Sequence, residues 1–238
     1  MDNTIYATLS RQSGLMGQMQ MVANNIANAN TTGFRAEGML FSEFIRRTGA
    51  DEPSLSMAAA RVRVTDLAQG ALAMTGGRFD LAIQGDGFFL VAAPDGERLT
   101  RAGAFTPDAE GNLVTMQGWP VLDAGGAPLF VPTGAGQVAI APDGTISADG
   151  QPVGQVGIVL PADPLAMTRF DGVGFRSDAG WEPAPDARIL QGFLEESNVD
   201  PVLEVARMIE VQRAYEMGQT FLEREDERIR NVIQTLSR

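Results

Sequence analysis

The chain of 238 residues has no cysteine, no histidine and no lysine, so all eighteen of its basic residues are arginine. A Ser-His-Asp triad, a thiol nucleophile, a lysine Schiff base and ordinary zinc coordination each require one of the missing residue types. Carboxylates, hydroxyls, tyrosine and arginine remain as reactive groups. We therefore expect no catalytic residues of these kinds, no metal site and no cofactor.

Basic patches and long apolar runs are also missing. Residues 1–50 and 201–238 are nearly neutral, whereas residues 51–200 carry eight arginines against twenty acidic residues. This acidic centre argues against nucleic-acid binding. No stretch reaches the roughly 18 apolar residues of a membrane span, and the N-terminus lacks the basic start and apolar run of a cleaved signal peptide. We therefore expect no direct membrane span, and any export to use another route.

The C-terminal residues 197–238 predict one long helix. Asp200 can cap the first turn, Pro201 suits the first helical position, and Gly218 is the only later helix-weakening residue. Apolar residues then recur at heptad spacing. One line contains Met208, Tyr215, Leu222 and Ile229, and Val205, Gln212 and Ile233 lie beside it. Such a helix needs a partner; a core helix of a compact domain and a homodimeric coiled coil are the alternatives.

Residues 3 to about 29 predict a second helix, because apolar residues follow steps of four and three. Its line contains Ile5, Leu9, Gln12, Met16, Met19, Ala23 and Ile26. Three asparagines near its end, Asn24, Asn25 and Asn28, offer amide groups for hydrogen bonds. After it, residues 41–45 could form a short amphipathic helix and residues 48–60 resemble a mobile connection. The matching spacing predicts that the two terminal helices pair in a coiled-coil-like bundle.

The middle of the chain predicts a small, mostly antiparallel β domain. Residues 50–196 contain twenty-one of the 27 glycines and twelve of the 13 prolines, with short apolar runs between them. Strands are expected at residues 79–83, 88–92, 113–115, 119–122, 129–131, 138–140, 153–160 and 189–193. The predicted fold class is therefore α+β. Its expected parts are residues 1–35, a connecting segment 36–75, the β domain 76–196 and the C-terminal helix 197–238.

Short motifs in the β region do not indicate a ligand. Gly-Asp-Gly at residues 85–87 lacks the third glycine and the following helix of a dinucleotide loop. Asp108, Glu110 and Asn112 alternate like calcium ligands, but no glutamate closes the loop. Two carboxylates at glycosidase separation would be needed for a secreted carbohydrate-acting enzyme, and no pair stands out.

Three sequence blocks resemble the rod, hook and hook-associated axial proteins of the bacterial flagellum. They are Ala-Asn-Asn-Ile-Ala-Asn at 23–28 with Thr-Gly-Phe-Arg at 32–35; Gly-Asp-Gly-Phe-Phe at 85–89 with Thr-Arg-Ala-Gly-Ala-Phe at 100–105 and Gly118; and Ser-Asn-Val-Asp at 197–200 with Gln-Arg-Ala-Tyr-Glu at 212–216. The modest length and the opening residues look most like the proximal rod proteins of this family. Distal rod proteins are the alternative, and a secreted carbohydrate-acting enzyme is a further one.

The resemblance implies a non-enzymatic subunit of the basal-body rod, which transmits torque in the periplasmic space. Its implied partners are other flagellar rod proteins, copies of itself, and the flagellar type III apparatus that exports it without a cleaved signal. The expected assembly interface lies on the two terminal helices. It contains Ile5, Leu9, Met16, Met19, Asn24, Asn25, Ile26 and Asn28 near the N-terminus, and Val205, Met208, Gln212, Tyr215, Leu222, Ile229 and Ile233 near the C-terminus.

Overall fold

The computed structural model describes residues 2–46 and 55–236 and divides the chain into two compact units. The helical unit comprises Met1–Ala27, Glu37–Asp66 and Asp200–Arg238. The β domain comprises Asn28–Ala36 and Leu67–Val199. The chain therefore passes between the two units four times.

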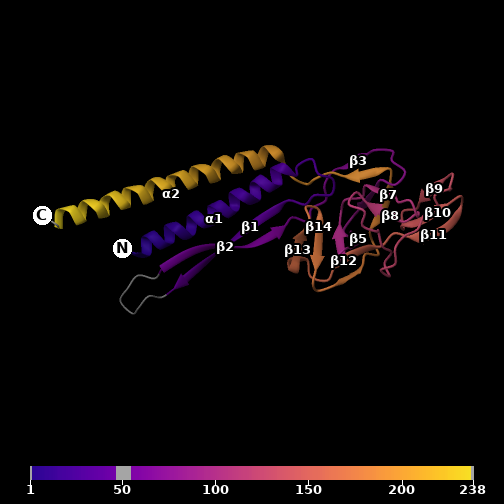
Figure 1. Cartoon of the computed structure of the whole chain (residues 1–238), viewed down its shortest axis with the longest axis horizontal. Helices are drawn as coiled ribbons and strands as arrows, with labels where there is room; N and C mark the ends of the chain where they lie inside the picture. Colours follow the sequence, from indigo (N-terminus) through magenta and orange to yellow (C-terminus); the bar gives the residue numbers. More distant parts are fainter. Residues whose placement is uncertain (1, 47–54, 237–238) are drawn as a thin grey trace. The chain divides into compact units, whose positions relative to one another are not determined.

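Two antiparallel helices dominate the helical unit (Figure 1). In α2 (Pro201–Leu236), the Asp200 carboxylate accepts hydrogen bonds from the N–H groups of Val202 and Leu203 at 2.9 and 3.1 Å, which confirms the predicted cap. The other helix, α1 (Asp2–Ala27), ends about two residues earlier than expected. A turn follows it, in which the Thr31 N–H donates to the Asn28 carbonyl at 3.0 Å.

An antiparallel hairpin completes the helical unit and corrects one prediction. Strands β1 (Glu37–Arg46) and β2 (Leu55–Thr65) pair along their whole length, with a register shift between Leu40 and Phe41. The expected short helix at residues 41–45 is therefore wrong. Phe41 and Ile45 are β-branched or aromatic residues that suit a strand, and pairing with β2 supplies their main-chain hydrogen bonds. Residues 55–60 of the expected mobile connection belong to β2, and residues 48–54 lie outside the described part.

The β domain is antiparallel at every pairing in the part of the chain that the structure describes, which confirms the predicted class. Its largest sheet has six strands in the order β13-β14-β6-β5-β12-β15. They are β13 (Met167–Phe170), β14 (Gly174–Ser177), β6 (Gly96–Thr100), β5 (Phe88–Ala93), β12 (Ile158–Pro161) and β15 (Trp181–Pro183). A 3-10 turn, Pro164–Ala166, precedes β13.

The β domain also contains one three-stranded sheet and three two-stranded sheets. A three-stranded sheet contains β9 (Val138–Ile140), β10 (Thr145–Ala148) and β11 (Gln151–Gln155). The pairs are β3 (Leu72–Met74) with β17 (Phe193–Glu195), β4 (Leu81–Gln84) with β16 (Arg188–Gln191), and β7 (Phe105–Pro107) with β8 (Leu113–Thr115). Because β3 and β17 pair, the beginning and the end of the long 67–199 segment lie together.

Strand β5 is buried on both faces and separates two apolar clusters. Phe89 and Val91 belong to the larger cluster, and Phe88 and Leu90 to the smaller one. This alternation is the period of two expected of a strand. The Phe89 and Phe105 rings meet edge to face with centroids 5.2 Å apart. The run Gly-Phe-Phe-Leu-Val thus supplies core packing to both sides of the domain.

Several strand boundaries differ from the prediction. The expected strand 153–160 is divided between β11 and β12, and the expected strand 189–193 is divided between β16 and β17 at Gly192, whose φ is +78°. Residues 119–122 and 129–131 make isolated bridges rather than strands. Strand β6 was missed because Arg98 interrupts its apolar pattern, although that side chain is buried. Gly96, Gly144 and Gly150 have positive φ values, which the tight turns next to β6, β10 and β11 require.

The loop between β7 and β8 uses the residues that alternate like calcium ligands for local hydrogen bonds instead. The Asp108 carboxylate accepts from the Glu110 and Asn112 main-chain N–H groups at 2.9 and 2.8 Å, and from the Asn112 side-chain amide at 3.1 Å. The Asn112 amide, followed by the main-chain donors, lowers the pKa of Asp108. The described residues contain no group of three or more acidic side chains placed to hold a metal ion.

This loop predicts a pH-dependent contribution to stability. A carboxyl pKa that folding lowers stabilises the folded chain above the unfolded pKa of about 3.9, and the contribution is lost as pH falls through the lower folded value. We expect Asp108→Asn to reduce the urea midpoint at pH 7 and to differ less from the parent chain at pH 3. A difference that stays constant between these pH values would contradict the assignment.

Candidate assembly site

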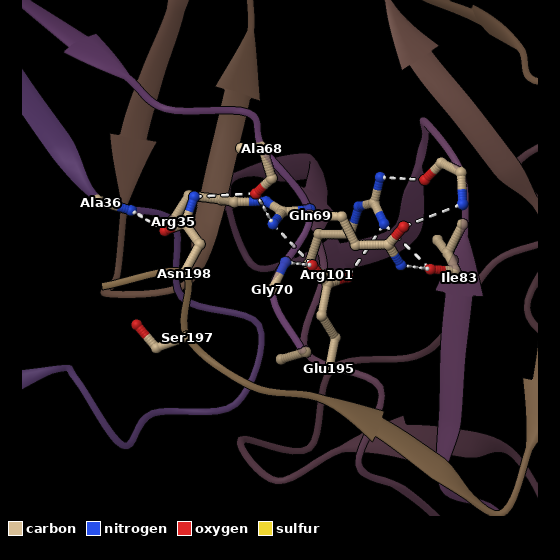
Figure 2. Close-up of polar contacts among 12 residues, drawn as sticks. Arg35, Ala36, Ala68, Gln69, Gly70, Ile83, Arg101, Glu195, Ser197 and Asn198 are labelled. Carbon is tan, nitrogen blue, oxygen red and sulfur yellow. Dashed lines mark hydrogen bonds and ion pairs between the residues drawn. The ribbon is translucent and has the colours of Figure 1, made fainter. Parts of the chain in front are cut away.

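The β domain contains a buried ion-pair cluster centred on Glu195 (Figure 2). Its carboxylate lies 2.6 Å from the Arg35 guanidinium and 3.0 Å from the Arg101 guanidinium, and all three side chains are buried. The same carboxylate accepts a hydrogen bond from the Gly70 N–H at 2.9 Å. One glutamate thus joins the segment after α1, the segment after β2 and the segment after β6. We call Arg35, Arg101, Glu195 and Asn198 the Glu195 cluster.

The cluster holds two positive charges against one buried carboxylate, because guanidinium groups remain protonated in proteins. Main-chain carbonyls accept further hydrogen bonds from the cluster: Arg101 donates to Gly85 at 2.7 Å and to Ile83 at 3.3 Å, and Arg35 donates to Ala68. The buried Arg101 Nε has no acceptor among the described residues. Burial lowers the pKa of Arg101, and the Glu195 carboxylate opposes that change. Each charge in the cluster therefore depends on the others for its stability in the interior.

Asn198 extends the cluster to the main chain. Its side-chain oxygen accepts from the Ala36 N–H at 2.6 Å, and its amide donates to the Ala68 carbonyl at 2.9 Å. Its own N–H donates to the Phe34 carbonyl at 3.3 Å. In Figure 2, Asn198 lies between the segments that carry Ala36 and Ala68. Three of the four segments through which the chain enters or leaves the β domain are therefore tied together by one side chain.

Gly33 lies where the segment after α1 passes close to the main chain that follows β6. Its N–H donates to the Glu195 carbonyl at 2.7 Å, and its φ is +69°. A Cβ atom there would overlap the main chain at Arg101 and Ala102 and would lie 2.7 Å from the Ala102 Cα. The Thr-Gly-Phe-Arg block thus combines a glycine that permits contact with an arginine that enters the Glu195 cluster.

Asn25 performs a similar task within the helical unit. Its side-chain oxygen accepts from the Glu37 N–H at 3.0 Å, and its amide donates to the Glu37 carbonyl at 2.9 Å and to the Glu204 carboxylate at 3.3 Å. Both Asn25 and Glu204 are buried, and Arg207 contacts Glu204 at 2.7 Å. The predicted interface residue Asn25 therefore joins α1, β1 and α2 of one chain.

The predicted residues of α2 divide into two groups. Met208, Tyr215, Leu222 and Ile229 are half-buried. At steps of four and three they alternate with Glu204 and Val211, which are buried, and with Gly218 and Glu225, which are half-buried. Val205, Gln212 and Ile233 are exposed in the single chain. The side-chain amide of Gln12 in α1 donates a hydrogen bond to the main-chain carbonyl of Tyr215 at 3.0 Å. The second row of covered residues on α2 therefore contains Glu204 and Val211, one residue before the predicted Val205 and Gln212.

The predicted residues of α1 are also mixed. Leu9 and Met16 are 50% and 60% exposed, because α1 packs against both α2 and the hairpin and its covered face is displaced from the predicted line. Met19, Asn24, Ile26 and Asn28 are half-buried, while the side chain of Ile5 lies outside the described part. Asn28 belongs to the β domain, where its side chain accepts from the Thr31 hydroxyl at 3.1 Å.

Glu195 had no assigned role in the sequence. The sequence signal for it is weak, because Glu195 ends the strand Phe-Leu-Glu at 193–195 and Glu196 follows it, as a solvated pair of charges would. Arg35, Arg101 and Asn198 were noted only as parts of sequence blocks. The contacts of Arg35 and Arg101 with Glu195 join residues 160 and 94 positions apart, and Asn198 bonds to Ala36 and Ala68 at similar separations. Periodicity does not reveal contacts of this kind.

No helix in the described ranges has the length and apolar character needed to cross a membrane. The site built from these residues offers buried ion pairs, asparagine bridges and close glycine packing, all of which fix chain segments in place. Together with the apolar surfaces of the helices, this arrangement is suited to a structural role.

Comparisons with known proteins identify the family. Residues 5–35 match the family described as flagella basal body rod protein, residues 82–148 match the flagellar hook protein FlgE/F/G D1 domain, and residues 190–235 match the flagellar basal body rod FlgEFG protein C-terminal family. The chain is 41% identical to the flagellar basal-body rod protein FlgF of Caulobacter vibrioides, with 100% of this chain and 99% of the relative covered.

Two further relatives place it within that family. FlgF of Mesorhizobium japonicum is 40% identical, with 91% of this chain and 90% of the relative covered, and FlgG of Bacillus subtilis is 29% identical, with 97% of each covered. Members of this family assemble with other rod and hook proteins, and the relatives' names place them in the basal body. The chain therefore belongs to the flagellar basal-body rod protein family, as a structural subunit and not an enzyme, and is most like the members named FlgF.

Proposed function

We propose that this rod subunit assembles through α1 and α2, which bury their outer surfaces against copies of the chain and other rod proteins. The supporting observation is where apolar residues remain exposed. Of the fifteen large hydrophobic side chains exposed in the described part, eleven lie on these two helices. A concentration of exposed apolar side chains on one part of a protein is typical of protein–protein contact sites.

The assembled helices form a coiled-coil-like bundle in this proposal. Alternating steps of four and three among the covered α2 residues, from Glu204 to Ile229, are the spacing of such a bundle. The polar position Gln12 opposite Gly218 can fix the register, because its amide already donates to the Tyr215 carbonyl. The predicted interface residues on both helices remain part of this proposal, as does the division of the chain into residues 1–35, 36–75, 76–196 and 197–238.

The same proposal places the subunit in the proximal rod, within the periplasmic space, after export by the type III apparatus. The full-length similarity to relatives named FlgF supports the proximal position over the distal one. In this role the subunit transmits torque through its bundled helices. The acidic middle of the chain suits a solvated β domain rather than a buried part of a drive shaft.

Val205→Asp tests assembly through the exposed face of α2. Val205 is 48% exposed in the single chain, so the substitution removes little packing within it. If Val205 is buried on assembly, an unpaired carboxylate costs several kcal/mol, and each 1.4 kcal/mol weakens association about tenfold. We expect cells with this variant to lose the rod and their motility.

Val205→Ile is the matched control, because it keeps an apolar β-branched side chain at the same place. Purified Val205→Asp protein should retain the circular dichroism and melting temperature of the parent. Normal motility with Val205→Asp, or failure of both variants to fold, would contradict the assignment of this face.

A further inference from the structure

The helical unit has a groove between α1 and α2, with a volume of about 350 Å³. Its walls include Arg11, Gln12 and Leu15 from α1, and Met217 and Phe221 from α2. Met217 is 67% exposed and Phe221 is 39% exposed, so the groove presents apolar surface. An opening of this kind between two helices has the shape that a third helix fills.

Gln12 is the buried polar side chain in the wall of the groove. The side chain is 93% buried, and its amide nitrogen donates to the Tyr215 carbonyl. Its side-chain oxygen is buried and has no hydrogen-bond partner within the described ranges. Buried side-chain acceptors in folded proteins nearly always have a donor. The Gln12 oxygen therefore lacks a donor, which a helix in the groove supplies when this side chain turns toward it.

The end of α2 supplies a matching surface elsewhere on the same chain. Gln12 lies beside Tyr215 and Asn25 beside Glu204, so the start of α1 at Asp2 lies beside about residue 225 at an antiparallel rise of roughly 1.5 Å per residue. Residues 229–236, which we call the α2 extension, therefore continue past α1. The line that α1 covers continues there through Val232 and Leu236, which are 51% and 83% exposed.

We propose that the α2 extension of a second copy of this chain lies in the groove between α1 and α2. The extension carries the apolar line that elsewhere packs on α1. Its exposed Asn231 amide can donate to the Gln12 oxygen once the Gln12 side chain turns toward the groove. The two surfaces are different patches of one chain, so the contact is heterologous and each copy can add another, which gives an open helical filament when the rotation between copies does not close a ring. A helical rod requires contacts of this type. The inference rests on the proposed function and names the partner of its helical surface.

The absence of cysteine makes a disulfide test direct. In the double variant Met217→Cys/Val232→Cys, the two positions are fifteen residues apart on one helix, or roughly 22 Å. A disulfide needs Cα atoms within about 7 Å, so a bond between them must join two copies. After oxidation of isolated basal bodies, we expect loss of the monomer band and a ladder of dimers, trimers and larger species on a non-reducing gel.

Single variants and a matched pair distinguish the alternatives. Val232→Cys alone should stay monomeric; dimers from it would indicate a two-fold contact between extensions and overturn the proposal. Gln212→Cys/Val232→Cys places the first thiol on an exposed α2 residue outside the groove lining. A ladder from this pair and none from the Met217 pair would overturn the groove while leaving helix-mediated assembly intact.

Absence of any ladder in basal bodies that contain the double variant would also overturn the proposal. In that case the Val205→Asp result still decides the proposed function separately. Motility of the reduced double variant shows that the substitutions themselves permit assembly, and Met217→Ser/Val232→Ser provides the same check without thiols.

Discussion

Replacing Glu195 by glutamine is expected to lower the free energy of unfolding of the β domain by about 3–5 kcal/mol. The substitution keeps the shape of the side chain and removes its charge. Arg35 and Arg101 then remain buried without their carboxylate, and the new amide group directs hydrogen toward a guanidinium. At roughly 2–4 °C per kcal/mol for a domain of this size, the melting temperature should fall by about 6–20 °C.

Glu196→Gln is the matched control, because it makes the same change at the next residue, which is exposed. Its effect should stay within about 0.5 kcal/mol. Chemical denaturation followed by tryptophan fluorescence measures both variants, since Trp119 and Trp181 lie in the β domain. A loss of less than about 1 kcal/mol for Glu195→Gln would show that the cluster behaves like exposed ion pairs.

The helices could be predicted well because their signals are local. Asp200 and Pro201 mark the start of α2, and the heptad from Met208 to Ile229 identifies its covered side. The line on α1 was less accurate, since a helix that packs on two partners buries a wider face than a single apolar line describes. Leu9 and Met16 follow the predicted spacing and are nevertheless exposed in the chain.

The β domain could be predicted as a class and only partly as strands. Glycine turns identify the hairpins, since Gly96 and Gly150 occupy positive-φ positions. Strands with polar or charged residues were missed, because tertiary contacts decide their burial. Arg98 is 4% exposed within β6, where an aspartate from the preceding turn, Asp95, pairs with it.

The Glu195 cluster shows why a site can be missed when its residues are visible in sequence blocks. The blocks at 32–35, 100–105 and 197–200 indicate a family, but they do not say which side chains meet. Glu195 lies outside all three and pairs with Arg35 of the first and Arg101 of the second. Asn198 of the third block bonds to the main chain of Ala36 and Ala68 instead. The pairing of β3 with β17, the turn after α1 and the pairing of β5 with β6 bring these segments together.

Gly33→Ala is expected to cost the β domain roughly 2–5 kcal/mol. An alanine at a φ of +69° costs about 1–2 kcal/mol in backbone conformation alone, and overpacking typically adds about 1–3 kcal/mol. The added Cβ would meet the main chain of Arg101 and Ala102, which cannot rotate away as a side chain could. Relief requires the segment to move away from β6, which also lengthens the Gly33 N–H to Glu195 carbonyl bond.

Gly118→Ala separates these two causes. Gly118 has a comparable φ of +82°, but an added Cβ would meet nothing within 4 Å. Its cost should therefore be the conformational part alone, about 1–2 kcal/mol. The difference between the two variants in denaturant unfolding measures the close contact of the segment after α1 with the β domain. Equal losses of unfolding free energy in the two variants would contradict that contact. A larger loss for Gly33→Ala means that no side chain fits where the segment after α1 meets the Arg101 main chain.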